Sequence, residues 1–281
     1  MQSGLYVCAT PIGNLQDITL RVLGALKEVD LILAEDTRHT RKLLTHFEIN
    51  TPLRSLHEHN EYEQIPALLA ELAGGASLAL VSDAGLPAVS DPGAELIKAV
   101  REQGYPVTVL PGPSAVTTAL LLSGMASGTG FGFIGFLPRA SKQRLELLEQ
   151  YSRLALPLIC FESPHRLSST LADLEAVLGN REVAVCRELT KIHEEVIRFP
   201  LPELRAYFAH HPPRGEITLV IAPAEELEAP AEVADSESVQ TAWRELQALG
   251  LNKKEVQETL QERFGLSRNE LYGLLLGKAE S

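Results

Sequence analysis

Short apolar runs alternate with longer amphipathic stretches through the first 123 residues of the chain. Runs rich in Val, Leu and Ala, with no polar residue at every second position, are typical of strands buried on both faces of a sheet. The stretches between them have the apolar spacing of helices. We therefore predict a βαβ series with a mainly parallel sheet, whose strands are Leu5–Ala9, Leu31–Ala34, Leu78–Val81 and Val107–Leu110.

A glycine-rich stretch, Ser123–Gly130, interrupts this series and is unsuited to the interior of a helix or strand. We place a domain boundary there, which gives an α/β domain over residues 1–123 and a second over residues 124–223. The second domain has more consecutive strands, which favours a mixed sheet. Its expected strands are 131–136, 156–162, 182–187, 196–199 and 216–222, with helices near 141–151, 164–178 and 201–210.

Residues 224–238 are rich in Ala, Glu and Pro and have too little apolar content to form a core, so we predict a solvated acidic linker. Three amphipathic segments follow over residues 239–281, and Ser267 and Glu270 have capping-box spacing at the start of the last one. This unit resembles a helix-turn-helix. A packing or dimerisation appendage is the alternative, and the basic side chains that favour RNA contact are Lys253, Lys254, Arg263 and Arg268.

The formal net charge of −12 argues against a protein that coats nucleic acid by charge alone. Six acidic residues between positions 225 and 237 supply half of that excess, so the rest of the chain is only mildly acidic. The N-terminus lacks a basic segment followed by an apolar one, and we expect a cytoplasmic protein. Three cysteines in apolar runs are expected to be core thiols.

Four strand ends combine Gly, Pro and small polar residues, at the edge where open α/β sheets bind ligands. The first lacks the Gly-x-Gly-x-x-Gly fingerprint of a dinucleotide site. In the second we interpret Asp83 as a ligand contact and Asp91 as the cap of the helix that begins near Gly93. In the third, Ser114 is a helix cap, a ligand contact, or both. The four loops are 10–19, 82–93, 110–115 and 161–166.

The order and spacing of these motifs resemble the tetrapyrrole methylase family, from about residue 4 to residue 223. The motifs are Thr10-Pro11-Ile12-Gly13-Asn14-Leu15, Glu35-Asp36-Thr37-Arg38, Ser82-Asp83-Ala84-Gly85, Ser90-Asp91-Pro92-Gly93, Pro111-Gly112-Pro113-Ser114-Ala115, Phe133-Ile134-Gly135-Phe136-Leu137-Pro138, Phe161-Glu162-Ser163-Pro164-His165-Arg166 and Gly215-Glu216-Ile217-Thr218-Leu219-Val220. The resemblance implies two α/β domains of the class III methyltransferase fold, S-adenosyl-L-methionine in the cleft between them, and a homodimer.

By the same resemblance, ten residues are expected to bind the cofactor: Pro11, Asp83, Ala84, Gly85, Leu86, Ser114, Ala115, Phe161, Leu189 and Thr218. Methylases of tetrapyrrole precursors carry a Gly-x-Gly-Pro-Gly first loop, whereas this chain has Ala9-Thr10-Pro11-Ile12-Gly13. That departure favours the branch of the family that methylates a cytidine ribose 2′-hydroxyl in the decoding region of small-subunit ribosomal RNA. The expected partner is that RNA, free or in the assembled small subunit.

Methyl transfer from a sulfonium is a one-step displacement, which a proton acceptor beside the hydroxyl assists. The candidate acceptors are Asp36, Glu162, His165 and Glu188, and the candidate RNA contacts in the α/β part are Arg38, Arg41, Lys42, Arg166, Arg187 and Lys191. Ion pairs that only hold the fold together are the alternative for each of them. We expect no metal, because the histidines of His57–Glu61 lack a second cluster of ligands.

Two other functions share parts of this pattern. A C-methyltransferase of a tetrapyrrole precursor would have the same fold and cofactor but no need for an RNA-binding appendage. A regulator that binds nucleic acid through residues 239–281 would bind without turnover. The elaborate loops at 82–93 and 111–115 favour catalysis over the second alternative.

Overall fold

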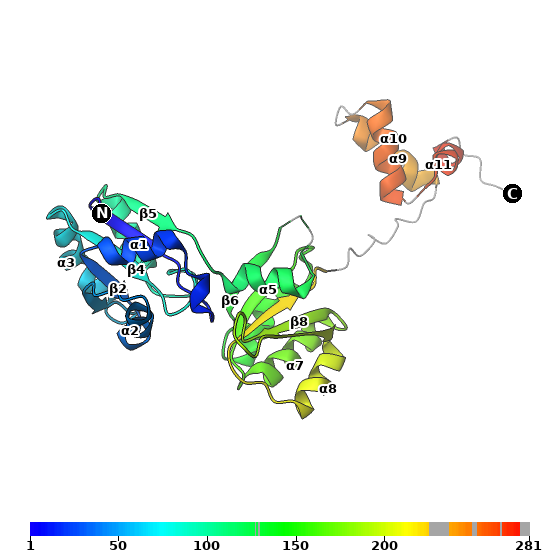
Figure 1. Ribbon diagram of the computed structural model, residues 1–281. Helices are drawn as coiled ribbons and strands as arrows, with labels where there is room; N and C mark the ends of the chain where they lie inside the picture. The colour runs from blue at the N-terminus through cyan, green and yellow to red at the C-terminus, as the bar shows by residue number, and fades with distance from the viewer. Residues whose placement is uncertain (127, 129, 225–235, 249–251, 265, 276–281) are drawn as a thin grey trace. The chain divides into compact units, whose positions relative to one another are not determined.

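The computed structural model describes residues 1–126, 128, 130–224, 236–248, 252–264 and 266–275. It divides into two compact units, Met1–Pro223 and Ala224–Ser281 (Figure 1). The first unit contains two five-stranded sheets among its described residues, and the second contains helices. Each unit is described by itself below.

The first sheet is parallel throughout and has the strand order β3-β2-β4-β1-β5. The four strands predicted from apolar runs are confirmed, but β3 was missed. Its three residues, Leu53–Ser55, are only half-buried and too few to show a pattern. The strands are β1 (Gly4–Cys8), β2 (Leu31–Ala34), β3 (Leu53–Ser55), β4 (Ser77–Val81) and β5 (Val107–Leu110).

Helices cover both faces of this sheet, as the continuously apolar strands require. Helices α1 (Leu20–Glu28) and α2 (Thr37–His46) cover one face, and α3 (Glu61–Ala73) and α4 (Ala94–Glu102) cover the other. A 3₁₀ turn, Leu15–Asp17, precedes α1. Each core therefore forms from one side of the sheet and its two helices.

The second sheet is mixed, as expected, with the order β6-β7-β10-β8-β9. Strands β6 and β7 are parallel, and the other pairs are antiparallel. Its strands are β6 (Gly132–Phe136), β7 (Leu158–Glu162), β8 (Glu182–Arg187), β9 (Glu195–Pro200) and β10 (Ile217–Ile221). Its helices are α5 (Ala115–Ser123), α6 (Ser141–Tyr151), α7 (Leu167–Leu178) and α8 (Leu201–His210).

Helix α5 belongs to the second sheet, although the sequence suggested a boundary after it. Its buried side chains Val116, Ala119 and Leu120 share a core with strands β7, β8 and β10. Gly124 follows as a left-handed helix cap with φ +68°, a conformation that glycine adopts without strain. The glycine-rich stretch therefore marks a helix end, and the chain passes to the second sheet between Leu110 and Ala115.

The second unit contains α9 (Ser236–Ala248), α10 (Lys253–Phe264) and α11 (Arg268–Leu275) around a small core of Val239, Val256, Leu260 and Leu271. The capping box is present: Ser267 N donates to Glu270 Oε2 at 2.7 Å, and Glu270 N donates to Ser267 Oγ at 3.4 Å. Most of the expected linker lies outside the described residues, and α9 begins inside its last part.

The three cysteines, Cys8, Cys160 and Cys186, are buried free thiols. Burial raises the pKa of Cys8 and of Cys186 to about 12, so both stay protonated at neutral pH. None of the helices in the described part of the chain is long and apolar enough to cross a membrane.

Candidate functional site

A cavity of about 660 Å³, called the first cavity below, is lined by loops that leave both sheets of the first unit. The segment after β4 contributes residues 83–86 and 89–91, the start of α5 contributes residues 114–117, and the end of β7 contributes residues 161–164. Residues 215–218, around the start of β10, complete the wall. Three of the four polar loops singled out in the sequence therefore converge on one cavity, to which the first loop contributes Ile12 alone.

Aromatic rings form one side of the first cavity. The rings of Phe133 and Phe136 lie 5.0 Å and 5.4 Å, centroid to centroid, from the ring of Phe161, and all three line the cavity. Such a wall suits a flat, conjugated group such as a nucleobase. Of the three, only Phe161 was expected to bind the cofactor; Phe133 and Phe136 belong to a motif of the resemblance but were given no role.

Another part of the lining carries three carboxylates, Glu35, Asp83 and Asp91. The pKa of Asp91 is raised to about 7, first by burial and then by Glu35 and Asp83. The pKa of Glu35 is also raised, first by burial and then by Asp83. Repulsion among these groups is relieved when a cation binds, so the wall favours a positively charged ligand.

Asp91 lines this wall because another residue caps α4. The carboxylate of Glu61, on α3, accepts hydrogen bonds from Gly93 N at 3.2 Å and Leu96 N at 2.9 Å. The interpretation of Asp91 as the cap is therefore wrong. The capping carboxylate comes from a position 32 residues away from Gly93 in the sequence, where local spacing gives no sign of it.

The loop that bears Asp83 is tied to the loop after β1. Thr10 and Gly85 exchange backbone hydrogen bonds at 2.8 Å and 3.1 Å, and the Thr10 hydroxyl donates to Ser82 O at 3.0 Å. Ala88 and Ser90 have φ values of +65° and +66°, which are strained for residues other than glycine. The hydrogen bonds to Thr10 thus fix the irregular backbone of the loop after β4 at residues 82–85.

Nine of the ten expected cofactor residues line the first cavity: Asp83, Ala84, Gly85, Leu86, Ser114, Ala115, Phe161, Leu189 and Thr218. Ser114 occupies the N-cap position of α5 without a side-chain capping bond. Its hydroxyl and the first amides of α5 are therefore placed to meet an anionic group. Pro11 lines a different cavity.

That second cavity has a volume of about 410 Å³. Its lining comes from the loop after β1, from His39, Thr40, Lys42 and Leu43 of α2, and from Lys191. It adjoins the first cavity through residues that line both, namely Ile12, Asp83, Ala84 and Glu216. The two cavities are therefore neighbours.

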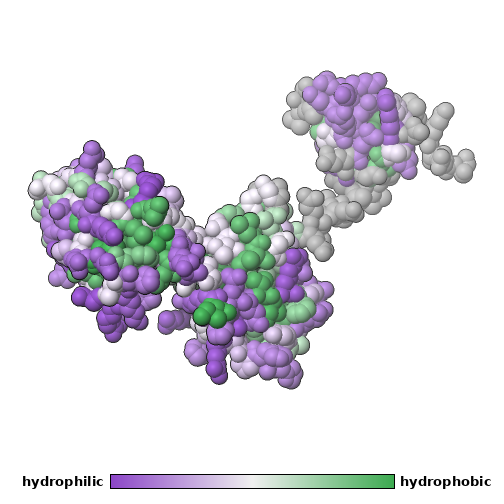
Figure 2. Space-filling model, in the orientation of Figure 1, coloured by the Kyte–Doolittle hydropathy of each residue, from purple (hydrophilic) through white to green (hydrophobic). Residues whose placement is uncertain are grey.

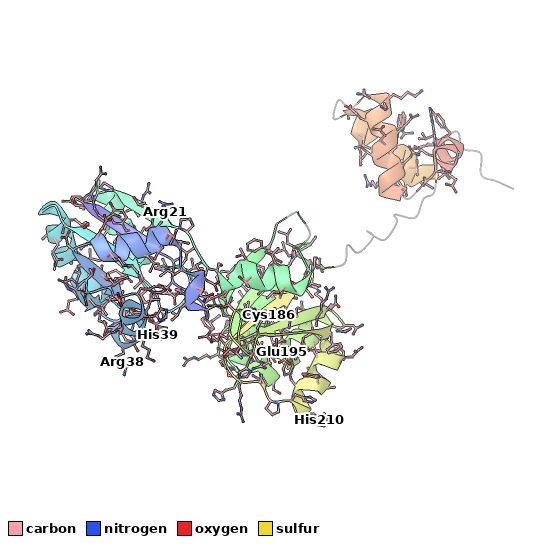
Figure 3. All side chains as sticks on the ribbon, in the orientation of Figure 1. Arg21, Arg38, His39, Cys186, Glu195 and His210 are labelled. Atoms are coloured by element: carbon pink, nitrogen blue, oxygen red, sulfur yellow. The ribbon has the colours of Figure 1, made fainter. Side chains whose placement is uncertain are left out.

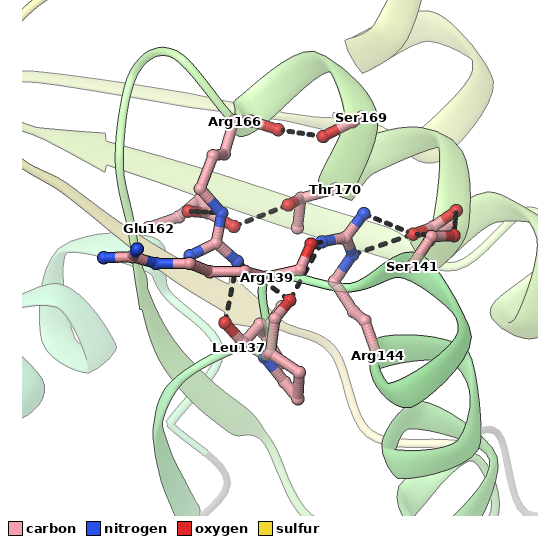
Figure 4. A network of polar contacts seen from close by, with 10 residues as sticks. Leu137, Arg139, Ser141, Arg144, Glu162, Arg166, Ser169 and Thr170 are labelled. Carbon is pink, nitrogen blue, oxygen red and sulfur yellow. Dashed lines mark hydrogen bonds and ion pairs between the residues drawn. The ribbon is translucent and has the colours of Figure 1, made fainter.

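Glu162 is buried at the edge of the first cavity and its carboxylate is already engaged (Figure 4). Oε2 accepts from the Thr170 hydroxyl at 2.5 Å, and Oε1 accepts from Ser163 N at 2.7 Å. Arg166 forms an ion pair with Glu162 at 3.3 Å and donates to Leu137 O at 2.7 Å. This network fixes the loop after β7 in place.

The other three expected proton acceptors, Asp36, His165 and Glu188, line neither cavity. Asp36 caps α2 and binds Arg38, whose guanidinium lowers the pKa of that carboxyl to about 2. His165 is exposed. Glu188 accepts from Lys191 Nζ at 2.9 Å, which lowers the pKa of the Glu188 carboxyl. The structure does not bring the four candidates together.

The expected RNA contacts fall into three groups. Lys42 and Lys191 line the second cavity, while Arg38 and Arg41 are exposed on α2. Arg166 is held in the Glu162 network, and Arg187 is paired with Glu195 at 2.9 Å. Lys253, Lys254 and Arg268 are exposed on the second unit. Figure 3 shows Arg38 and His39 together on α2; His39 was not expected, because a single histidine carries no motif.

Within the described residues, no group of three or more His, Cys, Asp or Glu side chains is placed to hold a metal ion. The rings of His57 and His59 lie 5.9 Å apart, centroid to centroid, without further ligands beside them among those residues.

Comparison with known proteins gives matches over most of the chain. Residues 4–205 match the family model of the Tetrapyrrole (Corrin/Porphyrin) Methylases. A protein of Synechocystis sp. named Ribosomal RNA small subunit methyltransferase I is 45% identical over 273 residues, which are 97% of this chain and 97% of that relative.

A protein of the same name from Thermotoga maritima is 46% identical over 217 residues. The match covers 97% of that relative but only 77% of this chain, so the Thermotoga protein is about as long as the first unit alone. Among solved structures, the methyltransferase CobJ has a TM-score of 0.61 at 18% identity, with 79% of this chain and 95% of CobJ covered. At that identity the likeness shows the fold.

Proposed function

The chain belongs to the tetrapyrrole methylase family, and from that premise we propose that it transfers a methyl group from S-adenosyl-L-methionine to small-subunit ribosomal RNA. The acceptor in this proposal is the 2′-hydroxyl of a cytidine ribose in the decoding region. The observation that carries the proposal is the match with small-subunit ribosomal RNA methyltransferases over nearly the whole chain. The two adjoining cavities supply a place for each reactant.

The residues of the first cavity fit S-adenosylmethionine. The aromatic wall of Phe133, Phe136 and Phe161 suits the adenine. The carboxylates of Asp83 and Asp91 suit a ligand with an ammonium and a sulfonium. The first amides of α5 and the Ser114 hydroxyl suit the carboxylate of the methionine part.

The cofactor supplies an electrophilic methyl group, which the acceptor oxygen takes in a single displacement at carbon as the bond to sulfur breaks. The chain's own residues have to hold the two reactants in line and exclude water. They also have to accept the hydroxyl proton. We assign proton acceptance to Asp83, because this residue lines both cavities. Its Oδ1 accepts from Asp36 N at 3.2 Å, whereas both carboxylate oxygens of Glu162 accept hydrogen bonds.

The assignment to Asp83 has its own test. Asp83→Asn keeps the shape of the side chain and removes the proton acceptor, so we expect kcat to fall by about 100-fold. Asp36→Asn, at an expected candidate that lines neither cavity, serves as the comparison. A larger loss of kcat in Asp36→Asn than in Asp83→Asn would refute the assignment.

We further propose a cytoplasmic homodimer, since the proposed substrate is ribosomal and α5 of the first unit has exposed apolar side chains. Leu121 and Leu122 on α5 are 72% and 44% exposed, and Figure 2 shows hydrophobic side chains at the surface over this helix. In this proposal a second copy of the chain covers α5. Leu121→Lys is expected to give monomers in sedimentation, whereas Ile192→Lys, at an exposed loop, leaves the dimer intact.

The function itself is tested with methyl-labelled S-adenosylmethionine and three separate acceptors: small ribosomal subunits, free small-subunit RNA and tetrapyrrole precursors. Label is located by nuclease digestion and mass spectrometry. We expect it on a ribose 2′-oxygen of the RNA, and the two RNA samples show whether the assembled subunit is needed. Label on a tetrapyrrole instead, or cofactor binding without transfer to any acceptor, would overturn the proposal.

A further inference from the structure

Helix α2 has a basic exposed face in a chain whose net charge is −12. Its sequence, Thr37–His46, contains no acidic residue. The basic side chains exposed on it are Arg38, His39, Arg41, Lys42 and His46. Asp36, just before the helix, neutralises Arg38 alone by binding its guanidinium. Arg41 and Lys42 form no ion pair with the residues that the structure describes, and their charges can attract a polyanion.

The same helix forms a side of the second cavity, which His39 and Lys42 line. The cavity therefore connects a basic surface to the wall that it shares with the first cavity, where Ile12, Asp83 and Ala84 lie. Because the displacement is in line, the acceptor oxygen has to approach the methyl carbon from the side opposite the departing sulfur. The second cavity has the position that an acceptor needs.

The Thr40 hydroxyl is a second, independent indication that the second cavity binds a ligand. The residue lines the second cavity, is only 2% exposed, and its hydroxyl has no hydrogen-bond partner in the described part of the chain. A buried hydroxyl without a partner costs free energy, so such groups are rare in proteins unless a ligand or water satisfies them. A ligand with hydrogen-bonding groups would remove that cost.

We infer that the second cavity is the subsite for the acceptor nucleotide, with the adjoining RNA backbone running over the basic face of α2. The inference rests on the proposed function and adds to it the place of the RNA, with His39, Thr40 and Lys42 as substrate contacts. A cavity of about 410 Å³ suits a single nucleotide. RNA is read mainly through unstacked nucleotides and backbone contacts, which this combination of a polar cavity and a basic helix provides.

Lys191 and Glu216 also line the second cavity and form an ion pair there. Lys191 Nζ is held at 2.9 Å from both Glu188 Oε1 and Glu216 Oε2. The charge of Lys191 is therefore balanced by two carboxylates. We now propose that Lys191 shapes the cavity and does not contact phosphate. The uncompensated cations come from α2, so the backbone of the RNA is expected on that side.

The test compares four full-length variants with the wild type. Thr40→Val removes the hydroxyl while keeping the side-chain shape, and the fold loses no hydrogen bond because the hydroxyl makes none with the described residues. We expect unchanged or higher thermal stability and a KM for small ribosomal subunits raised about threefold to tenfold. His39→Gln and Lys42→Gln are expected to raise KM as well. The matched control is Arg21→Gln, at an exposed residue on α1 outside both cavities.

Two readouts separate substrate contact from general damage. The dissociation constant for S-adenosylmethionine should stay within twofold of the wild-type value in all four variants. The slope of log KM against log salt should become shallower by about 0.7 in Lys42→Gln and stay unchanged in Arg21→Gln, because one phosphate contact is lost only in the former. Equal KM values in the three cavity variants and the control would overturn the inference.

A third measurement does not depend on turnover. Ultraviolet crosslinking of the wild-type protein to small-subunit RNA, followed by peptide mapping, is expected to give crosslinks within residues 10–15 and 37–43. Absence of crosslinks from both segments would overturn the inference even if methylation occurs. If the wild type transfers no methyl group to RNA but these crosslinks form, the proposed function fails and the RNA subsite stands.

Discussion

The carboxylate of Glu162 and the hydroxyl of Thr170 lie 2.5 Å apart and join the end of β7 to α7. Both side chains are buried, at 2% and 0% exposure. Hydrogen bonds to a buried charge are among the stronger ones, since each unsatisfied oxygen of the carboxylate is costly. Because Ser163 and Pro164 come next and line the first cavity, this pair links the stability of the second sheet to the shape of that cavity.

Thr170→Val should therefore destabilise the protein by about 2 kcal/mol, the typical loss for a hydrogen bond to a charged group. For a protein of this size that corresponds to a decrease in Tm of about 4–8 °C in calorimetry. Ser169→Ala is the matched control, because the neighbouring Ser169 hydroxyl is exposed and binds only Arg166 O. A similar Tm in the two variants would show that the pair contributes nothing special.

Asp91→Asn should change how cofactor binding depends on pH. Since the pKa of Asp91 is raised to about 7, the carboxyl is neutral at pH 6 and ionised at pH 8. We expect the wild type to bind S-adenosylmethionine more tightly as pH rises across this window, and Asp91→Asn to lose most of that dependence. Calorimetric titration at pH 6, 7 and 8 measures it, with Glu102→Gln, at an exposed carboxyl of α4, as the control.

The same substitution should stabilise the protein without cofactor at alkaline pH. The pKa of Asp91 is higher in the folded chain than in the unfolded chain, so its favourable contribution is complete below about pH 4 and is lost as pH rises through 7. At pH 8, the free energy of unfolding of Asp91→Asn should be higher than that of the wild type by roughly 1 kcal/mol, after allowance for solvent screening. This difference corresponds to an increase in Tm of about 2–4 °C. The gap should close at pH 4; a gap that widens there would contradict the argument.

Gly13→Ala should damage the second cavity. A Cβ at Gly13 would lie 2.6 Å from Leu189 O and 2.6 Å from Lys191 Cγ, closer than van der Waals contact allows, so a backbone has to move. We expect a loss of about 1–3 kcal/mol in unfolding free energy and a marked fall in RNA methylation. In Gly24→Ala, where nothing lies within 4 Å of the added atom in α1, stability should rise by about 0.5–1 kcal/mol. Urea unfolding of both variants gives the comparison.

Deletion of residues 224–281 should leave a folded first unit that binds S-adenosylmethionine. The second unit has its own core, and the Thermotoga relative is covered by a match of 217 residues. If the helices contact RNA through Lys253, Lys254 and Arg268, the deletion raises KM for small ribosomal subunits with little change in kcat. Loss of cofactor binding would show instead that the first unit does not stand alone.

The strands of the first sheet could be predicted because strands buried on both faces leave long apolar runs, as at Leu31–Ala34. The domain boundary could not be predicted in the same way, because a glycine that ends a helix, such as Gly124 after α5, looks in the sequence like a glycine in a linker. A helix belongs to the sheet against which its buried side chains pack, and that is decided by contacts distant in sequence. Strand β3 was not predicted because it has only three residues.

Most of the residues expected to bind the cofactor line one cavity, and many of them stand in loops whose Gly and Pro content is hard to explain otherwise, such as 82–86. The candidate proton acceptors could not be ranked from the sequence. Asp36, Glu162 and Glu188 are each satisfied by a partner close in sequence or space, and the presence of an acid at a strand end does not reveal that partner. His39 and Thr40 were missed because a basic helix face becomes meaningful only beside a cavity.

The capping of α4 by Glu61 has an evolutionary consequence. The start of α4 is capped by a carboxylate from α3, so the residue at position 91 is not needed as a helix cap. Substitutions there can alter the preference for a charged or neutral ligand without unwinding the helix. Position 61 is constrained, because the cap requires an acidic side chain there. We therefore expect relatives that bind different ligands to vary at position 91 and to retain an acidic residue at position 61.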